Sequence, residues 1–84
     1  MSFRVVMTRT AARQLAETAA AACVEFVFGS LADNPFRVGS PLREPFKGRW
    51  RERRGEYRVR YRIDEPDRIV YVLDVNHRRD AYRT

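Results

Sequence analysis

The 84-residue chain contains one cysteine, one histidine and one lysine, and its apolar residues never form a long run. Cys23 has no second cysteine to pair with, which excludes an internal disulfide and favours a reducing compartment. The longest apolar run, residues 19–24, is far shorter than the roughly 20 residues that cross a bilayer. The N-terminal residues also lack the apolar stretch of an export signal. We therefore expect a cytoplasmic protein.

The composition indicates a small folded domain. Hydrophobic residues make up 44% of the chain and aromatic residues 12%, which is too apolar for a disordered segment. A chain of this length can build one compact core and no more. We expect a single domain spanning residues 1–84.

Arginine is abundant, since only one of the 17 basic residues, Lys47, is a lysine. Residues 43–62 hold nine basic and three acidic side chains, so this window accounts for the net charge of +6. A basic block among aromatic residues is typical of a protein that binds a polyanion, usually nucleic acid, and the planar guanidinium binds phosphate through two hydrogen bonds. A solvated charged face or a GC-rich genome would give the same composition, so the charge leaves both interpretations open.

The N-terminal part predicts a strand followed by helix. Residues 3–7 are β-branched and apolar, and Thr8 or Thr10 can cap a helix behind them. Apolar residues spaced by three and four then continue to Leu31 as one helical stripe. The stripe fits one helix or a hairpin of two helices broken near Thr18.

Gly29 and the Asn34-Pro35 pair should end the helical part, because proline lacks an N–H and disfavours helix in the residue before it. Residues 33–48 contain three prolines and two glycines and predict an extended loop.

Beyond this loop the pattern has a period of two, which predicts strands. The strand at residues 50–54 and the strand that begins at Tyr57 are joined by a tight turn at Gly55. Each strand is expected to place arginines on one face and apolar or aromatic residues on the other. The arginines are Arg49, Arg51, Arg53, Arg58, Arg60 and Arg62, and the opposite positions include Trp50, Tyr57, Val59, Tyr61 and Ile63.

Residues 69–75 are apolar except for Asp74, which predicts a central strand covered on both faces. Asn76 and His77 are expected to leave the sheet, and residues 78–83 to form a short tail. The resulting fold is α+β: an N-terminal strand, one or two helices and a three-stranded antiparallel meander, in one sheet with helices on one face.

This geometry predicts an open arginine ladder. If the helical stripe covers the face that carries Tyr61, then Arg58, Arg60 and Arg62 point to solvent, joined by Arg51 and Arg53 if the strand register allows. Like charges on neighbouring strands cost about 0.2–1 kcal/mol per pair, and such costs tend to occur at functional sites. We therefore interpret the ladder as a phosphate-binding surface, with partial neutralisation by acidic neighbours as the alternative.

Three stretches of the C-terminal half resemble the RelE/ParE toxin superfamily. They are Pro41-Leu42-Arg43, residues 54–64 with the sequence RGEYRVRYRID, and residues 75–83 with the sequence VNHRRDAYR. The order of strand, helices and Asn-Pro loop matches as well, so the resemblance covers essentially the whole chain. It implies the RelE-like fold and the toxin half of a bacterial toxin–antitoxin pair, with a RelB-like antitoxin as partner.

In its RelE branch the resemblance implies an endoribonuclease that cleaves mRNA in the ribosomal A site and inhibits translation, without metal or cofactor. The ribose 2′-hydroxyl attacks the adjacent phosphate, which requires a base, cations on the phosphate and an acid for the leaving oxygen. By position, Arg58 would hold the scissile phosphate, and Arg78 would stabilise the transition state or assist the leaving group. Tyr82 would stack on a base or help activate the hydroxyl.

The general base is where this chain departs from the RelE pattern. Arg51 and Arg53 occupy the positions of a lysine pair, and arginine remains protonated because its pKa exceeds about 12. His77 has a side chain suited to proton transfer at neutral pH. Tyr82, a ribosomal RNA group and solvent remain as other acceptors.

Two further functions stay open at the level of sequence. A ParE-like toxin would share the fold and the central hairpin but poison DNA gyrase without cleaving RNA. A basic binding module without catalysis would explain the charge but not the pairing of Arg78 with Tyr82, which favours the endoribonuclease.

Overall fold

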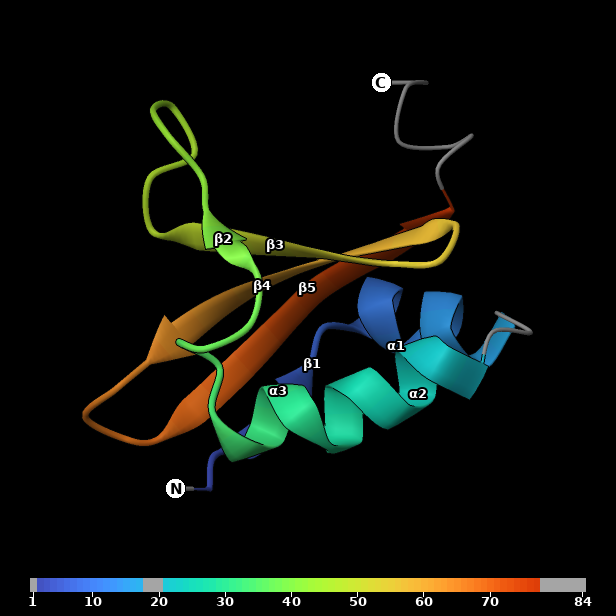
Figure 1. Ribbon diagram of the computed structural model, residues 1–84, viewed down its shortest axis with the longest axis horizontal. Helices are drawn as coiled ribbons and strands as arrows, with labels where there is room; N and C mark the ends of the chain where they lie inside the picture. Colours follow the sequence, from blue (N-terminus) through green and yellow to red (C-terminus); the bar gives the residue numbers. More distant parts are fainter. Residues whose placement is uncertain (1, 18–20, 78–84) are drawn as a thin grey trace.

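The computed structural model describes residues 2–17 and 21–77, which form a twisted five-stranded sheet with three helices packed on one face (Figure 1). The strand order is β1-β5-β4-β3-β2, so the last strand in sequence is an interior strand, between β1 and β4. The elements are β1 (Arg4–Met7), α1 (Arg9–Glu17), α2 (Ala21–Phe28), α3 (Ser30–Asp33), β2 (Ser40–Pro41), β3 (Arg49–Arg54), β4 (Tyr57–Asp64) and β5 (Ile69–His77). Within these residues, no helix is long and apolar enough to cross a membrane.

The predicted α+β architecture, N-terminal strand and antiparallel meander are confirmed, and the sheet has one further strand, β2. β1 pairs in parallel with β5, from Arg4 opposite Ile69 to Met7 opposite Val72. β2 is a two-residue strand inside the segment predicted as loop, paired with β3 through Ser40 and Arg51. A strand of two residues that contains a proline has no periodicity for sequence reasoning to detect.

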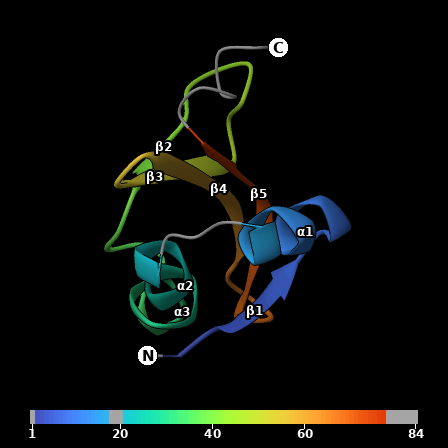
Figure 2. The same ribbon diagram turned by 90° about the vertical axis from the view of Figure 1, so that its right-hand side faces the viewer.

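The helical stripe belongs to separate helices, α1 and α2, which lie side by side under the sheet (Figure 2). Thr8 caps α1, because its Oγ1 accepts a hydrogen bond from the Ala11 N–H at 3.0 Å. The single stripe is wrong in detail: in α2, Val24, a position of the stripe, is exposed, whereas Phe26, outside the stripe, is buried. A second helix starts with a new phase, so spacings carried across the break assign some residues to the wrong face. The expected break at Thr18 lies outside the described residues.

The core lies between the helices and one face of β4 and β5. Val59 and Tyr61 of β4 are fully buried there, as predicted, together with Val70 and Val72 of β5. The Tyr61 hydroxyl donates to the Val38 carbonyl at 2.7 Å and lies 3.1 Å from the Pro35 carbonyl, and so ties the loop to the sheet. Trp50, also predicted as core, stacks on Tyr61 with ring centroids 6.2 Å apart.

β5 departs from its prediction in two respects. It is an interior strand, but Tyr71, opposite Arg62 on the face away from the helices, is only half-buried, so the described helices cover one of its faces and leave the other open. The strand also continues through Asn76 and His77, which were expected to leave the sheet. β4 begins at Tyr57, directly opposite His77, and therefore offers a partner to the whole of β5.

Candidate functional site

The register of β3 and β4 brings six arginines together in three directly opposed pairs. We call the sheet face that carries them the arginine face: Arg49 opposite Arg62, Arg51 opposite Arg60, and Arg53 opposite Arg58. The predicted ladder is therefore present, and Arg51 and Arg53 join it as the register condition required.

In the described part of the chain, no helix lies over the arginine face, because α1, α2 and α3 all pack on the opposite side of the sheet (Figures 1 and 2). On the arginine face, Arg62 and the three arginines that β3 contributes are exposed, while Arg58 and Arg60 are half-buried. Three opposed pairs of like charge oppose folding by about 0.2–1 kcal/mol each. The fold thus keeps a repulsive cluster in contact with solvent, where a polyanion can reach it.

An acidic neighbour, Asp74, compensates this charge at Arg60. The Arg60 guanidinium contacts Asp74 with Nη2–Oδ2 at 2.6 Å and Nε–Oδ1 at 2.9 Å. The hydrogen bond to Asp74 raises the pKa of Arg60, so this residue stays protonated. Glu52, by contrast, projects to the helix side and pairs with Arg54 at 3.2 Å.

Arg54 illustrates why the basic block in the sequence overstates the basic surface. By strand alternation it falls on the helix side, where its guanidinium lies 4.5 Å from the centre of the Phe26 ring. On the opposite side, Arg62 lies 4.4 Å from the centre of the Tyr71 ring. Tyr71 therefore adds an aromatic surface to the arginine face, and no sequence pattern singled it out.

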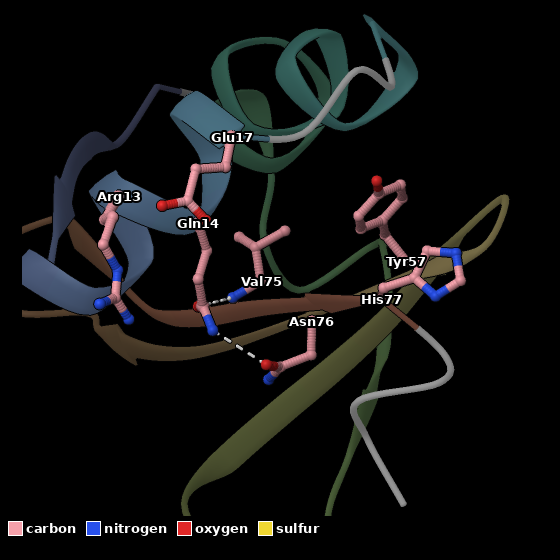
Figure 3. A pocket seen from close by; sticks show the side chains of 7 residues that line it. All are labelled: Arg13, Gln14, Glu17, Tyr57, Val75, Asn76 and His77. Carbon is pink, nitrogen blue, oxygen red and sulfur yellow. Dashed lines mark hydrogen bonds between the residues drawn. The ribbon is translucent and has the colours of Figure 1, made fainter. Parts of the chain in front are cut away.

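His77 lies on the other side of the sheet. It is opposite Tyr57, with ring centroids 5.2 Å apart, and both rings belong to the helix-facing side (Figure 3). They border a cavity of about 410 Å³ between α1 and the ends of β4 and β5, which Arg13 and Glu17 also line. The structure therefore does not bring His77 together with Arg58, whose partner across the strands is Asn76.

The remaining candidates, Arg78 and Tyr82, lie outside the described residues. The contact between Arg60 and Asp74 agrees with the alternative that acidic neighbours partly neutralise the ladder, and the sequence carried one signal for it. Asp74 is the only charged residue in an otherwise apolar strand, and a charge there needs a partner.

Comparison with known proteins agrees with this fold. The family model for the ParE toxin of type II toxin–antitoxin systems, parDE, matches residues 5–82. Toxin RelE of Mycobacterium tuberculosis is 48% identical over 84 residues, which cover 96% of this chain and 87% of that protein. Toxin RelG of the same organism is 46% identical over 86 residues, which cover 99% of both chains.

Two solved structures extend the comparison. A chain in the toxin–antitoxin complex RelBE2 of Mycobacterium tuberculosis superposes with a TM-score of 0.84 and 44% identity, covering 92% of this chain and 99% of that one. The archaeal RelE–RelB complex of Pyrococcus horikoshii gives a TM-score of 0.57 at 18% identity, with 93% and 97% covered, and supports the fold alone.

The fold is thus the RelE-like α+β fold, with an arginine-lined sheet face as its distinguishing surface. The chain belongs to the ParE toxin family within the RelE/ParE superfamily, and it is a toxin of the type II toxin–antitoxin class.

Proposed function

We propose that this toxin is an endoribonuclease that cleaves mRNA in the ribosomal A site and thereby inhibits translation. The observation that carries the proposal is the arginine face, with three opposed arginine pairs on a side of the sheet that no described helix covers. Basic grooves bind single-stranded RNA along its phosphates, and aromatic rings beside them stack on bases. Tyr71, next to Arg62, supplies such a ring.

In the proposed reaction the ribose 2′-oxygen forms a bond to phosphorus while the bond from phosphorus to the 5′-oxygen breaks. Arg58, with Arg53 directly opposite, holds the scissile phosphate and stabilises the charge that develops on it. Arg51 binds a neighbouring phosphate, whereas Arg60 contributes less because Asp74 compensates its charge. No metal takes part, in keeping with the resemblance to RelE.

The proton of the 2′-hydroxyl needs an acceptor, and arginine cannot serve because it stays protonated. The position of His77 on the helix-facing side separates it from Arg58, so we do not include His77 in the catalytic set. Arg78 and Tyr82 remain in the proposal on the strength of the family resemblance. Arg78 assists the leaving oxygen, and Tyr82 orients a base or helps activate the hydroxyl.

The proposal includes a cognate antitoxin that binds this chain. Both solved relatives are described as complexes of a RelE protein with a RelB protein. The charge of the arginine face favours a partner with acidic residues, because complementary charge accelerates association and discriminates against wrong partners. Covering this face would also block access of RNA to it.

A second candidate is a ParE-like gyrase poison, which the match to the ParE toxin family favours. An arginine-rich surface would suit a DNA–protein target as well as RNA. The two candidates differ in the molecule that they damage, so they can be separated directly.

The test begins with induced expression of the chain in bacteria, with and without its antitoxin. Growth arrest that the antitoxin relieves is expected, and unimpaired growth at confirmed soluble expression would exclude toxicity. Primer extension on mRNA from an in-vitro translation reaction should then show new 5′ ends, and purified gyrase should keep its supercoiling activity. Inhibited supercoiling with intact message would establish the ParE-like alternative.

A further inference from the structure

The strand β5 contains a bulge that decides which side chains reach the arginine face. Arg60 pairs with Asp74, but the next residue of β4, Tyr61, pairs with Val72, so Leu73 is left without a partner on β4. Because side chains alternate along a strand, this extra residue reverses the faces of everything after it. Asp74 and Asn76 therefore lie on the arginine face, whereas an unbulged strand would turn them toward the helices.

The start of α1 holds the bulge in place. β1 ends at Met7, opposite Val72, so β5 has no strand neighbour on that side from Leu73 onward. Thr8 takes the place of a neighbouring strand first: its N–H donates to the Val72 carbonyl at 3.0 Å, and its Oγ1 donates to the Leu73 carbonyl at 2.7 Å. Gln14 does so next, because its Oε1 accepts a hydrogen bond from the Val75 N–H at 2.7 Å (Figure 3).

Gln14 also begins a chain of hydrogen bonds that ends on the arginine face. Its Nε2 donates to Asn76 Oδ1 at 2.9 Å, and Asn76 Nδ2 donates to Asp74 Oδ1 at 2.9 Å. Asp74 in turn accepts two hydrogen bonds from the Arg60 guanidinium. Asn76 lies directly opposite Arg58, so the chain runs beside the residue assigned to the scissile phosphate.

Only an amide side chain can make both contacts of Gln14. The Val75 N–H requires an acceptor, which fixes the amide oxygen on that side and turns the amide N–H groups toward Asn76. A carboxylate could accept from Val75 but could not donate to Asn76. The residue at position 14 is therefore matched to the bulge and to Asn76 together.

We propose that Gln14 is a positioning residue of the toxin that does not itself contact RNA. Through the β5 bulge and the Asn76–Asp74 chain it fixes the geometry of Arg58 and Arg60 on the arginine face. This inference rests on the proposed function for its kinetic effect. Small displacements of catalytic groups reduce rates steeply, by about 10²-fold for a shift of about 1 Å. Loss of the chain should therefore slow cleavage more than it weakens RNA binding.

The kinetic test compares four variants of the full-length chain by steady-state RNA cleavage and thermal melting. Gln14→Ala should lower kcat by about 10- to 100-fold with KM within about threefold, following the size of the positioning effect. Gln14→Glu keeps the contact to Val75 and should fall between Gln14→Ala and the unmodified chain. Arg13→Ala alters the neighbouring residue on α1, whose side chain is exposed, and should change kcat by less than about twofold. Ile63→Val removes one core methyl group at the far end of β4 and controls for lost stability.

A kcat for Gln14→Ala within about twofold of the unmodified chain would overturn the inference. So would an equal loss in Ile63→Val at a similar melting temperature, because the effect would then follow stability rather than geometry.

A second measurement does not depend on RNA cleavage. In ¹⁵N NMR spectra the Arg60 Nε–H and the Val75 N–H should exchange slowly with water in the unmodified chain. Both should shift and exchange faster in Gln14→Ala, whereas Arg13→Ala should leave them unchanged. If the unmodified chain cleaves no RNA, the proposed function fails, and an Arg60 Nε–H signal that Gln14→Ala leaves unchanged overturns the inference independently.

Discussion

Arg60 and Asp74 form a bidentate ion pair across β4 and β5, and this pair compensates one positive charge in the middle of the arginine face. The Nη2–Oδ2 distance is 2.6 Å, and the side chain of Asp74 is only 16% exposed. The neighbouring arginine pairs, Arg53 with Arg58 and Arg49 with Arg62, lie on either side of Arg60 and its partner Arg51. Asp74 therefore compensates charge at the middle of the face rather than at its ends.

Replacing Asp74 by asparagine should release the charge of Arg60. We expect tighter binding of single-stranded RNA and a plot of log affinity against log salt that is steeper by about 0.7, the slope expected for one more phosphate contact. Fluorescence anisotropy with a short RNA at several salt concentrations measures this. Asp67→Asn, in the exposed turn after β4, is the matched control for the change in net charge. Equal slopes for the two variants would show that Asp74 does not limit phosphate binding by Arg60.

Arg58→Ala should abolish most RNA cleavage in a folded protein. Removing a cation directed at the transition-state phosphate should lower the single-turnover rate by about 10²–10³, as removal of an oxyanion-hole donor does. Arg78→Ala should behave similarly by the family resemblance. Arg9→Ala, at an exposed position at the start of α1, is the control. It should change the free energy of unfolding by no more than about 0.5 kcal/mol and should retain activity. Retained cleavage in Arg58→Ala would remove this residue from the proposed mechanism.

His77→Gln should cleave RNA at a rate within about threefold of the unmodified chain, an ordinary effect for a residue outside the chemistry. The reason is its position on the helix-facing side, opposite Tyr57. Single-turnover rates between pH 5.5 and 8 should have the same profile in both proteins. A rate that rises across about pH 6–7 in the unmodified chain and becomes flat in His77→Gln would instead identify the imidazole as the base.

Gly39→Ala should destabilise the protein more than Gly55→Ala. Both glycines have left-handed backbones, with φ of 66° and 59°, so both substitutions carry a conformational cost of about 1–2 kcal/mol. At Gly39 an added Cβ would also lie 2.4 Å from the Tyr61 hydroxyl and 2.8 Å from the Arg51 carbonyl, whereas at Gly55 it meets nothing within 4 Å. Urea unfolding measures the difference, and equal losses would show that the loop yields without cost.

Stability should fall as the pH rises above about 10, and Tyr61 is one cause. Burial raises the pKa of the Tyr61 phenol, with Glu52 adding to the effect. A group whose pKa is raised by folding contributes its full stability below its unfolded pKa of about 10 and loses it at higher pH. The free energy of unfolding between pH 8 and 11 should therefore decline less steeply in Tyr61→Phe. That variant should also lose about 1 kcal/mol at neutral pH, because its hydroxyl bonds to the loop are gone. Parallel pH profiles would exclude this role of Tyr61.

Local sequence was sufficient to predict the strands of the sheet that carry the arginines. Alternation along residues 57–63 predicted that Val59 and Tyr61 are buried and that Arg62 is exposed, because the period of two is a property of a single strand. The family resemblance extended the prediction to the whole fold. Neither the local pattern nor the resemblance could place β2, whose two residues are defined only by their pairing with β3.

Other features depend on contacts between segments distant in the sequence. Whether Arg51 and Arg53 join the ladder was decided by the register of β3 against β4, which alternation within one strand does not specify. The face of His77 was decided by one unpaired residue, Leu73, in a bulge that Thr8 and Gln14 hold from sixty residues away in the chain. The sequence by itself determined that an arginine-rich sheet would form with one face covered by helices. The tertiary structure decided which charges that face presents, because a side chain's face follows from strand pairing and its net charge from the partner it meets there.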